Sequence, residues 1–295
     1  MSGWVQFLLA VLFVVLAPLA GCLLAGVDRK ISARMQGRQG PPLLQPYYDL
    51  RKLLDKDERT PNRFQDFYLA CYLLWIVVSG AMFYAGMDFL LVVFTLILGE
   101  VFLVLAAYCS GSPYSQIGAQ REMYVAMAYE PLLLLMAAGF YLYTGGSDGG
   151  TFEVLSIAED SEMAVVPMLG LFAAFIIILT MKLRKSPFDL SMSHHAHQDI
   201  VRGAATEFSG RAYAMMEVSH WYENIMLLGI VALFFQNGEW TGVLLGLVVA
   251  VLAYLLEVWI DNGFARMKWQ SALKTGWVVS LILGVGNVAV LLVIA

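Results

Sequence analysis

The chain has 295 residues, of which 60% are hydrophobic and only 14% are charged, and its mean hydropathy is +0.71. No soluble domain of this length needs so much apolar surface, so the composition excludes a soluble protein and predicts an integral membrane protein. The formal net charge of −5 gives no reason to expect a nucleic-acid partner.

Eight apolar runs are long enough to cross a bilayer, which takes about 20 helical residues. No alternating pattern typical of β-strands competes with them, so the sequence predicts an all-α membrane protein with one polytopic domain over residues 1–295. The first run is longer than a signal-peptide core, and we expect it to be retained. The predicted spans cover residues 4–27, 67–87, 89–109, 122–144, 163–182, 212–236, 242–261 and 275–294.

The positive charges between these spans predict their orientation. Nine of the 18 Lys and Arg residues lie between Asp28 and Arg63. The other nine lie in or beside the segments 110–121, 183–211 and 262–274. Because basic loops stay on the cytoplasmic side of a membrane, all four segments are predicted to be cytoplasmic and both termini to lie outside.

The first of these loops, residues 28–66, has structure of its own. Glycine and proline at positions 37 and 40–42 predict a turn. After it, apolar residues recur with helical spacing on one face, which predicts an amphipathic helix. This helix either lies on lipid headgroups or forms a docking surface for a soluble partner. The residues of its apolar stripe are Leu43, Tyr47, Leu50 and Leu54.

Acidic residues inside the apolar spans are the main candidates for chemistry. A carboxylate in hydrocarbon costs about 2.5–3.5 kcal/mol at a helix centre, so these residues are rare unless they face a polar interior. Several of them on four helices favour a path for protons or for charge coupling, although for a single residue hydrogen bonding between helices is the alternative. The candidates are Glu100, Glu130, Glu217, Glu223, Glu257 and Asp261.

Each candidate has a local context. Glu100 has no basic residue within two turns, so we expect it to be neutral or bonded to another helix. Glu130 precedes Pro131, which frees a backbone acceptor and predicts a kink beside the carboxyl group. Asp261 follows Glu257 by four residues and could instead pair with basic residues at the membrane surface.

The sixth span carries Glu217, His220 and Glu223 at intervals of three, which predicts a polar stripe along one face. Glu217 and His220 also match half of a di-iron signature. A di-iron site needs a second Glu-x-x-His pair on a facing helix, and the sequence has none. We therefore predict no metal in this span.

The loop 183–211 contains three histidines in four positions. Their spacing does not place two imidazoles on one helical face, and no cysteine is near, so metal binding is not predicted. Imidazole changes charge near neutral pH, and these residues are predicted to pass protons from a docked partner into the membrane. The predicted proton-entry residues are Asp189, His194, His195, His197 and Asp199.

Several motifs resemble those of the complex I subunit 1 family. They are the segment from Asp28 to Pro42 with Leu43–Pro46, then 128–131 (Ala-Tyr-Glu-Pro), 187–190 (Pro-Phe-Asp-Leu) and 207–210 (Glu-Phe-Ser-Gly). They come in the family's order and spacing over nearly the whole chain. Pro42 and the segment Ser-His-His-Ala-His-Gln-Asp at 193–199 depart from the quinone-reducing version and are similar to the Ech-type energy-converting nickel–iron hydrogenases.

This resemblance implies a membrane anchor and ion-coupling subunit in the cytoplasmic membrane of a prokaryote. Its implied partners are the hydrogenase large and small subunits, a ferredoxin-like iron–sulfur subunit, an antiporter-like membrane subunit and ferredoxin itself. The nickel–iron centre and the iron–sulfur clusters would belong to the partners, since isolated Cys22, Cys71 and Cys109 cannot hold them. No catalytic centre is therefore predicted in this chain, and no metal, cofactor or quinone site.

The resemblance also assigns residues. Glu130 and Glu207 match acidic positions that lead from the family's substrate-side cavity toward its central hydrophilic axis, and the other buried acids are assigned to that axis from burial and spacing. The docking residues are Asp28, Arg29, Arg34, Arg38, Gln45 and Pro46. Two alternatives remain: the quinone-site subunit of a complex I-type respiratory dehydrogenase, and a free-standing secondary transporter, for which the expected repeat or broken helices are not found.

Overall fold

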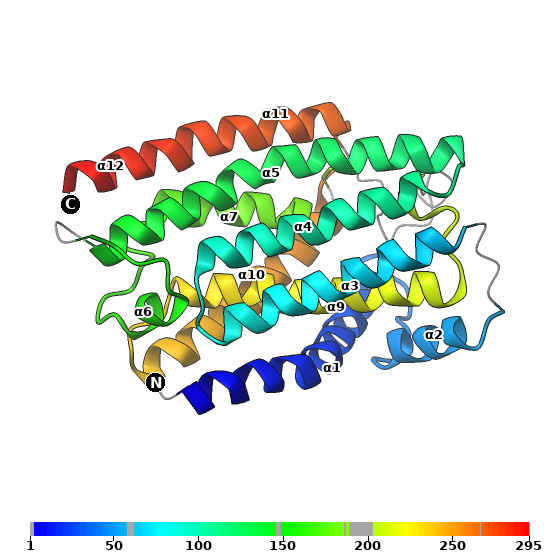
Figure 1. Ribbon diagram of the computed structural model, residues 1–295, viewed down its shortest axis with the longest axis horizontal. Coiled ribbons are helices and arrows are strands. Elements are labelled where there is room, and N and C mark those ends of the chain that lie inside the picture. The colour runs from blue at the N-terminus through cyan, green and yellow to red at the C-terminus, as the bar shows by residue number, and fades with distance from the viewer. Residues whose placement is uncertain are drawn as a thin grey trace.

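The computed structural model describes residues 3–57, 62–145, 149–185, 187–188, 203–265 and 267–294. Within these residues the chain is helical, without any β-strand, and the predicted all-α fold is confirmed. Figure 1 shows the long helices side by side in one bundle. The helices are α1 (Gly3–Met35), α2 (Gln45–Leu54), α3 (Arg63–Tyr84), α4 (Phe89–Tyr108), α5 (Pro113–Gly145), α6 (Val154–Glu159), α7 (Leu169–Lys182), η1 (Gly203–Ala205), α9 (Gly210–Leu233), α10 (Trp240–Gly263), α11 (Trp269–Val279), η2 (Ser280–Val285) and α12 (Gly286–Ile294).

Every predicted span overlaps a helix, the fifth only over the 14 residues of α7 and the last one α11, η2 and α12 in succession. Six helices in the described part of the chain are long and apolar enough to cross a membrane. Helix α7 is apolar but has only 14 residues, and α9 has 24 residues but carries Glu217, His220 and Glu223. Both chain ends lie at the same end of the bundle, opposite α2 (Figure 1), as an even number of crossings requires. The number eight and the orientation stay predictions.

Two helix boundaries differ from the prediction by more than the others do. Helix α1 does not end at residue 27 but continues to Met35, because the basic segment contains good helix formers and no breaker before Gly37. Gly37 then takes a φ of +70°, which confirms the predicted turn. Helix α5 begins at Pro113 rather than near residue 122 and runs on through Pro131 as one helix. The first part of the basic loop is therefore helical.

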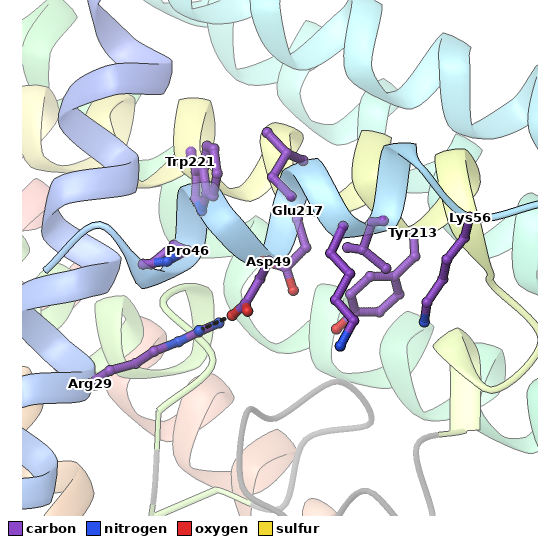
Figure 2. A pocket seen from close by; sticks show the side chains of 10 residues that line it. Arg29, Pro46, Asp49, Lys56, Tyr213, Glu217 and Trp221 are labelled. Carbon is purple, nitrogen blue, oxygen red and sulfur yellow. Dashed lines mark hydrogen bonds and ion pairs between the residues drawn. The ribbon is translucent and has the colours of Figure 1, made fainter. Parts of the chain in front are cut away.

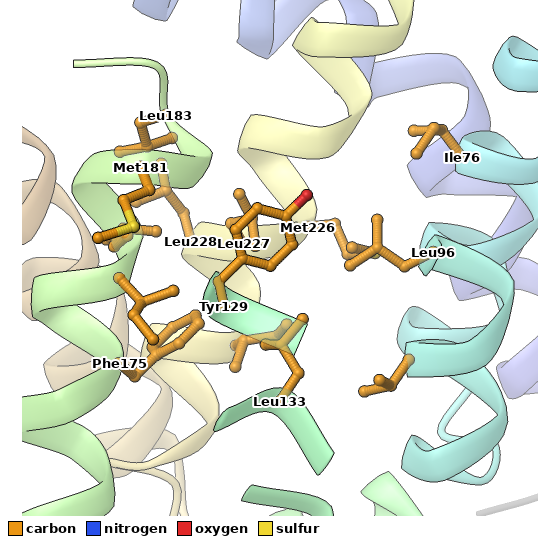
Figure 3. Packing of buried hydrophobic residues seen from close by; sticks show 14 of the residues in the cluster. Ile76, Leu96, Tyr129, Leu133, Phe175, Met181, Leu183, Met226, Leu227 and Leu228 are labelled. Carbon is orange, nitrogen blue, oxygen red and sulfur yellow. The ribbon is translucent and has the colours of Figure 1, made fainter. Parts of the chain in front are cut away.

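The interior of the bundle is filled by aromatic and branched side chains. Tyr72, Phe140 and Phe175 are among the largest fully buried residues. Figure 3 shows Tyr129 amid this cluster, with side chains of α7 on one side and of α3 and α4 on the other. Large apolar side chains such as Leu244 are exposed on the outside, which is the face that a membrane or a neighbouring membrane subunit would cover.

A glycine allows the segment before α2 to approach α1 closely. A Cβ atom at Gly26 would lie 1.9 Å from the carbonyl oxygen of Leu43, a backbone atom that cannot move aside as a side chain can. No other residue fits at position 26 without displacing this segment. The contact fixes where α2 lies against the bundle, and so positions one wall of the surface pocket between α1, α2 and α9 described below.

Candidate functional site

The end of α7 is the centre of the polar interior. The N–H of Arg184 donates to the carbonyl oxygen of Met181 (3.1 Å), and the N–H of Lys185 donates to that of Thr180 (2.9 Å). These two bonds form a Schellman motif, in which the residue after the cap is usually glycine. Here it is Arg184, with a φ of +57°. The sharp turn sends the side chains of Lys182, Arg184 and Lys185 toward three different carboxylate sites.

The first site is the inner cluster, which consists of Lys182, Glu100, Glu223, Tyr72 and Tyr129. The ammonium group of Lys182 donates to Glu100 and, at 3.2 Å, to Glu223. It also lies 4.2 Å from the ring centroid of Tyr129. The hydroxyl of Tyr129 donates to Glu100, and that of Tyr72 donates to Glu223 at 3.4 Å. Five helices, α3, α4, α5, α7 and α9, thus contribute one side chain each.

The inner cluster is almost closed to solvent. The side chains of Lys182, Glu100 and Glu223 are 2%, 11% and 3% exposed. Two charges removed from water cost several kcal/mol each, and only close pairing with hydrogen bonds offsets that cost. Glu100 was expected to bond to another helix, and it does so with both Tyr129 of α5 and Lys182 of α7. Lys182 lies 82 positions away in the sequence. Sequence spacing gave no sign of this pairing.

Arg184 forms the second site with Glu122 of α5, whose carboxylate oxygen lies 3.5 Å from a guanidinium nitrogen. Burial alone would lower the pKa of the Arg184 guanidinium, but the carboxylate of Glu122 and other negative groups around it raise the pKa above its ordinary value. Arg184 is therefore a permanent cation. The left-handed backbone costs about 1–2 kcal/mol for a residue with a Cβ atom, and this ion pair offsets part of that cost.

The third site is the outer cluster, which consists of Lys185, Asp28, Asp261 and Glu257. Lys185 donates to Asp28 of α1, and its nitrogen lies 3.7 Å from a carboxylate oxygen of Asp261 in α10. Glu257 is fully buried one turn before Asp261, and its oxygens make no hydrogen bond within the described residues. The outer cluster ties α1, α7 and α10 together, and it borders a 310 Å³ pocket that Arg38 also lines.

The outer cluster bears on the alternative interpretation of Asp261. That alternative is a pairing of Asp261 with Arg266 and Lys268 at the membrane surface. Asp261 is buried and faces Lys185, because the end of α7 turns toward α10. Arg266 itself lies outside the described residues.

The remaining acidic candidates lie apart from both clusters. Glu130 is half-buried next to Tyr129, and no hydrogen bond or ion pair of Glu130 is found in the described structure. Glu207 is half-buried in the turn after η1. Glu217 lines a surface pocket, so the predicted single stripe of Glu217, His220 and Glu223 is wrong. Steps of three residues rotate around a helix by about 60° each, which turns Glu223 into the core and leaves Glu217 outside.

This surface pocket has a volume of 420 Å³ and lies between α1, α2 and α9. Figure 2 shows Arg29 reaching from α1 to Asp49 of α2, while Tyr213, Glu217 and Trp221 come from α9. The Arg29–Asp49 ion pair measures 2.6 Å. Lys52 and Lys56 of α2 add further positive charge, so charged and apolar side chains line the pocket together.

Comparison with known proteins identifies the family. A family model described as NADH dehydrogenase matches residues 7–292. The chain belongs to the NADH dehydrogenase subunit 1/H family. The resemblance inferred from the first loop and the later motifs is thereby confirmed.

Members of this family similar to the chain occur in two kinds of complex. Hydrogenase-4 component C of Escherichia coli (strain K12) is 26% identical, over 91% of this chain and 89% of that protein. Formate hydrogenlyase subunit 4 of the same strain is 24% identical, over 86% of this chain and 89% of that protein. NADH-ubiquinone oxidoreductase chain 1 of Patiria pectinifera is 26% identical, over 94% of this chain and 90% of that protein.

A solved structure shares the fold. A chain of the membrane-bound sulfane sulfur reductase, an archaeal respiratory membrane complex, superposes with a TM-score of 0.81 at 24% identity. The match covers 96% of this chain and 99% of that chain. The protein is thus a multi-pass membrane subunit of the kind found in complex I-like and hydrogenase-like energy-converting complexes.

The docking residues predicted for this family member divide into two groups. Asp28 and Arg29 are held by Lys185 and Asp49, Gln45 donates to Asp49 at 2.9 Å, and Pro46 is buried at the start of α2. These residues fix the loop against the bundle. Arg34 and Arg38 are exposed and available to a soluble subunit. The stripe on α2 is also exposed at Tyr47 and Leu54, which leaves both the headgroup and the docking interpretation open.

The predicted proton-entry residues Asp189, His194, His195, His197 and Asp199 lie outside the described residues. In the rest of the chain, no three His, Cys, Asp or Glu side chains come together as ligands for a metal ion. Cys22, Cys71 and Cys109 are free thiols on α1, on α3 and after α4. The described residues therefore offer no ligand set that fits a nickel–iron centre or an iron–sulfur cluster.

Sequence analysis missed the basic and aromatic members of the clusters. From the sequence, Lys182 and Lys185 count only as charges at a cytoplasmic helix end. Tyr129 enters only as part of the motif at 128–131, and Tyr72 is not singled out. One signal was present: three bases within four positions directly after an apolar run must find partners if the helix end is buried. Which partners they find depends on the packing of helices distant in sequence.

Proposed function

We propose that this chain is the membrane anchor and ion-coupling subunit of an energy-converting nickel–iron hydrogenase of the Ech type. It would link ferredoxin-dependent proton reduction, or hydrogen oxidation, in docked soluble subunits to movement of protons or sodium ions. The hydrogenase assignment is supported by similarity over most of the chain to subunits of hydrogenase-4 and formate hydrogenlyase, together with the histidine-containing motif at 193–199.

The observation that supports coupling is the inner cluster. Ionisable groups from separate helices are costly inside a membrane protein and mark ion or proton pathways. Lys182 joins Glu100 and Glu223, and Tyr129 provides a further hydroxyl at the same point. A change of charge in a docked subunit would alter the balance among these groups. In this scheme the candidate entry residues His194 and Asp199 would exchange protons with the partner, and Glu207 and Glu130 would lie between the docking face and the clusters.

The proposal has consequences for partners and location. The soluble face would bind the hydrogenase large and small subunits and a ferredoxin-like iron–sulfur subunit, with ferredoxin as the redox partner of the complex. An antiporter-like membrane subunit would adjoin the helices, in the cytoplasmic membrane of a prokaryote. The nickel–iron centre and the clusters would be held by those partners, and this chain would hold none.

The decisive experiment is to purify the chain with its native partners and to measure nickel content and ferredoxin-dependent hydrogen evolution. We expect both in the same complex. A complex that lacks nickel and turns over with ferredoxin or quinone instead would contradict the hydrogenase assignment while keeping the family. A chain that purifies alone in detergent, with transport activity, would contradict both.

A second candidate is the quinone-site subunit of a complex I-type dehydrogenase. The specific observation in its favour is the 420 Å³ pocket between α1, α2 and α9, which combines Trp221 and Leu53 with charged groups and is large enough for a small ring compound. The same purified complex tests this candidate. Quinone-dependent turnover that is blocked by compounds competing for the pocket, and by Trp221→Ala, would favour it.

A further inference from the structure

We propose that the surface pocket between α1, α2 and α9 binds the headgroup of an aminophospholipid, a lipid whose phosphate is joined to a primary amine. The phosphate lies against Lys52 and Lys56 on the α2 side, and the amine lies against Glu217 of α9. This inference goes beyond the proposed coupling function, because it concerns a lipid that joins α2 to α9 and neither the redox reaction nor the transported ion.

The charged groups of the pocket are not equally available to a ligand. Arg29 and Asp49 form an ion pair of 2.6 Å, and Asp49 also accepts a hydrogen bond from within α2, so both are occupied. Lys52, Lys56 and Glu217 also line the pocket, and none of them makes an ion pair or a hydrogen bond within the described residues. The groups left for a ligand are therefore two cations and one carboxylate.

The two lysines form a positive wall. Lys52 belongs to the last turn of α2, Lys56 follows the cap of that helix, and both side chains are exposed. In Figure 2 the side chains of Lys56, Tyr213 and Glu217 point the same way, into the pocket. Ammonium groups bind phosphate, and basic pockets between membrane helices bind the headgroups of phospholipids. The α2 side of the pocket therefore suits a phosphate group.

Glu217 makes the opposite wall selective. A pocket that bound only a phosphate would lose affinity through this carboxylate, because like charges repel each other. Tyr213 and Trp221 lie one turn before and one turn after Glu217 on α9, and both line the pocket. A carboxylate with aromatic rings on either side attracts an ammonium group by charge and by the faces of the rings. The α9 side therefore suits the amine of the same headgroup.

An apolar surface on α1 favours a lipid over a soluble ligand. Gly26 contacts the segment before α2, and Leu19 and Leu12 precede it by two and four turns on the same face of α1. Leu19 is 60% exposed and Leu12 is 46% exposed. Acyl chains attached to a headgroup in the pocket can cover this face, whereas a soluble ligand would leave it uncovered.

The test uses the complete complex, purified with its partners and placed in nanodiscs of phosphatidylcholine. Two lipid probes carry a photoactivatable group near the glycerol: phosphatidylethanolamine, and phosphatidylglycerol, which keeps the phosphate but lacks the amine. Labelled peptides are identified by mass spectrometry after irradiation at low probe concentration. We expect phosphatidylethanolamine to label the segments 45–56 and 213–221 about tenfold more than phosphatidylglycerol does, because only its amine bonds to the carboxylate of Glu217.

Variants assign the two ends of the headgroup. Glu217→Gln should reduce labelling by phosphatidylethanolamine about tenfold without reducing labelling by phosphatidylglycerol, since glutamine keeps the size of the side chain but not its charge. Lys52→Gln combined with Lys56→Gln should reduce labelling by both lipids. Lys268→Gln combined with Lys274→Gln, at exposed positions before and within α11, is the matched control and should change neither.

The other outcomes overturn the inference. Equal labelling by the two lipids would show a site for phosphate alone, and an equal loss in the control variant would show general attraction to the membrane surface. Absence of labelling in the segments of α2 and α9 would also overturn it, and quinone-dependent turnover blocked at the pocket would then support the second candidate function. The preference between lipids is measured on the unaltered complex, so poor folding of a variant does not affect it. Neither hydrogen evolution nor ion uptake is measured, so a failure of the proposed coupling function is distinguishable from a failure of this inference.

Discussion

The inner and outer clusters have similar composition but different surroundings. In each, one lysine from the end of α7 meets carboxylates from two other helices. The inner cluster is enclosed by the apolar core, with Lys182 and Glu223 at most 3% exposed. The outer cluster borders a pocket of 310 Å³, and Asp28 is 17% exposed. The comparison shows that residue type alone does not decide what such a cluster does. Enclosure on all sides makes the inner charges costly and sensitive. In the outer cluster Glu257 and Asp261 are also buried, but Asp28 reaches the pocket, and the cluster holds three helices together.

The largest effect is expected for Lys182→Met. It leaves Glu100 and Glu223 buried without their cation, and breaking a buried pair in this way costs about 3–5 kcal/mol. The measurement is denaturant unfolding of the purified complex in detergent micelles. Lys274→Met, at an exposed position, serves as the control. An equal loss of unfolding free energy in both variants would mean that removing the cation from the inner cluster does not leave costly unpaired carboxylates.

A smaller effect is expected for Lys185→Met in the outer cluster. It removes a charged hydrogen bond to Asp28, which is worth about 2 kcal/mol when partly solvated. Salt screens exposed charges more than enclosed ones, so raising the salt concentration should reduce this loss but leave that of Lys182→Met nearly unchanged. The same unfolding assay at low and high salt tests this. Identical salt responses in the two variants would remove the distinction between the clusters.

Glu130 lies next to Tyr129 of the inner cluster but makes no hydrogen bond with the cluster. Glu130→Gln therefore tests whether Glu130 takes part in proton transfer to it. If Glu130 passes protons toward Glu100, the number of ions moved per hydrogen formed should fall about tenfold, equivalent to about 1.4 kcal/mol in the rate of transfer. Glutamine keeps the size and the hydrogen-bonding ability of the side chain, so stability should hardly change. The measurement is ion uptake per hydrogen formed by the complete complex in sealed liposomes, driven by reduced ferredoxin. An unchanged ratio would show that Glu130 is structural.

The smallest effect is expected for Arg184→Gly, at the turn that separates the two clusters. Glycine relieves the left-handed backbone but removes the ion pair with Glu122, so the two changes nearly cancel and the net change stays within about 1 kcal/mol. Arg184→Ala loses the ion pair and keeps the strain, so it should be the less stable variant in the unfolding assay. If glycine and alanine give the same result, backbone strain at position 184 is negligible.

Much of the fold follows from local sequence. Apolar runs longer than a bilayer is thick predict the helices, and the positions of Glu100, Glu223 and Asp261 within those runs mark a polar interior. The motifs from Asp28 to Pro46 and around Glu130 indicate the family without any structure. These features are predictable because hydropathy, turn residues and motif spacing are properties of neighbouring residues.

The composition of the site could not be predicted in this way. Lys182 meets Glu100 across 82 positions and Lys185 meets Asp28 across 157. Periodicity on one helix tells which residues share a face, but not which face of another helix they meet. Periodicity also predicted that Glu217 and Glu223 share one polar face of α9, but Glu217 lines a surface pocket.

Hydropathy, charge placement and motif spacing are therefore enough to identify a helical membrane subunit of the NADH dehydrogenase subunit 1/H family, with acids in its spans and bases in its loops. Which acid meets which base follows from the packing of the helices. The physical reason is that pairing depends on how helices cross and on how α7 ends. The left-handed turn at Arg184 sends Lys182 into the core and Lys185 toward α1 and α10.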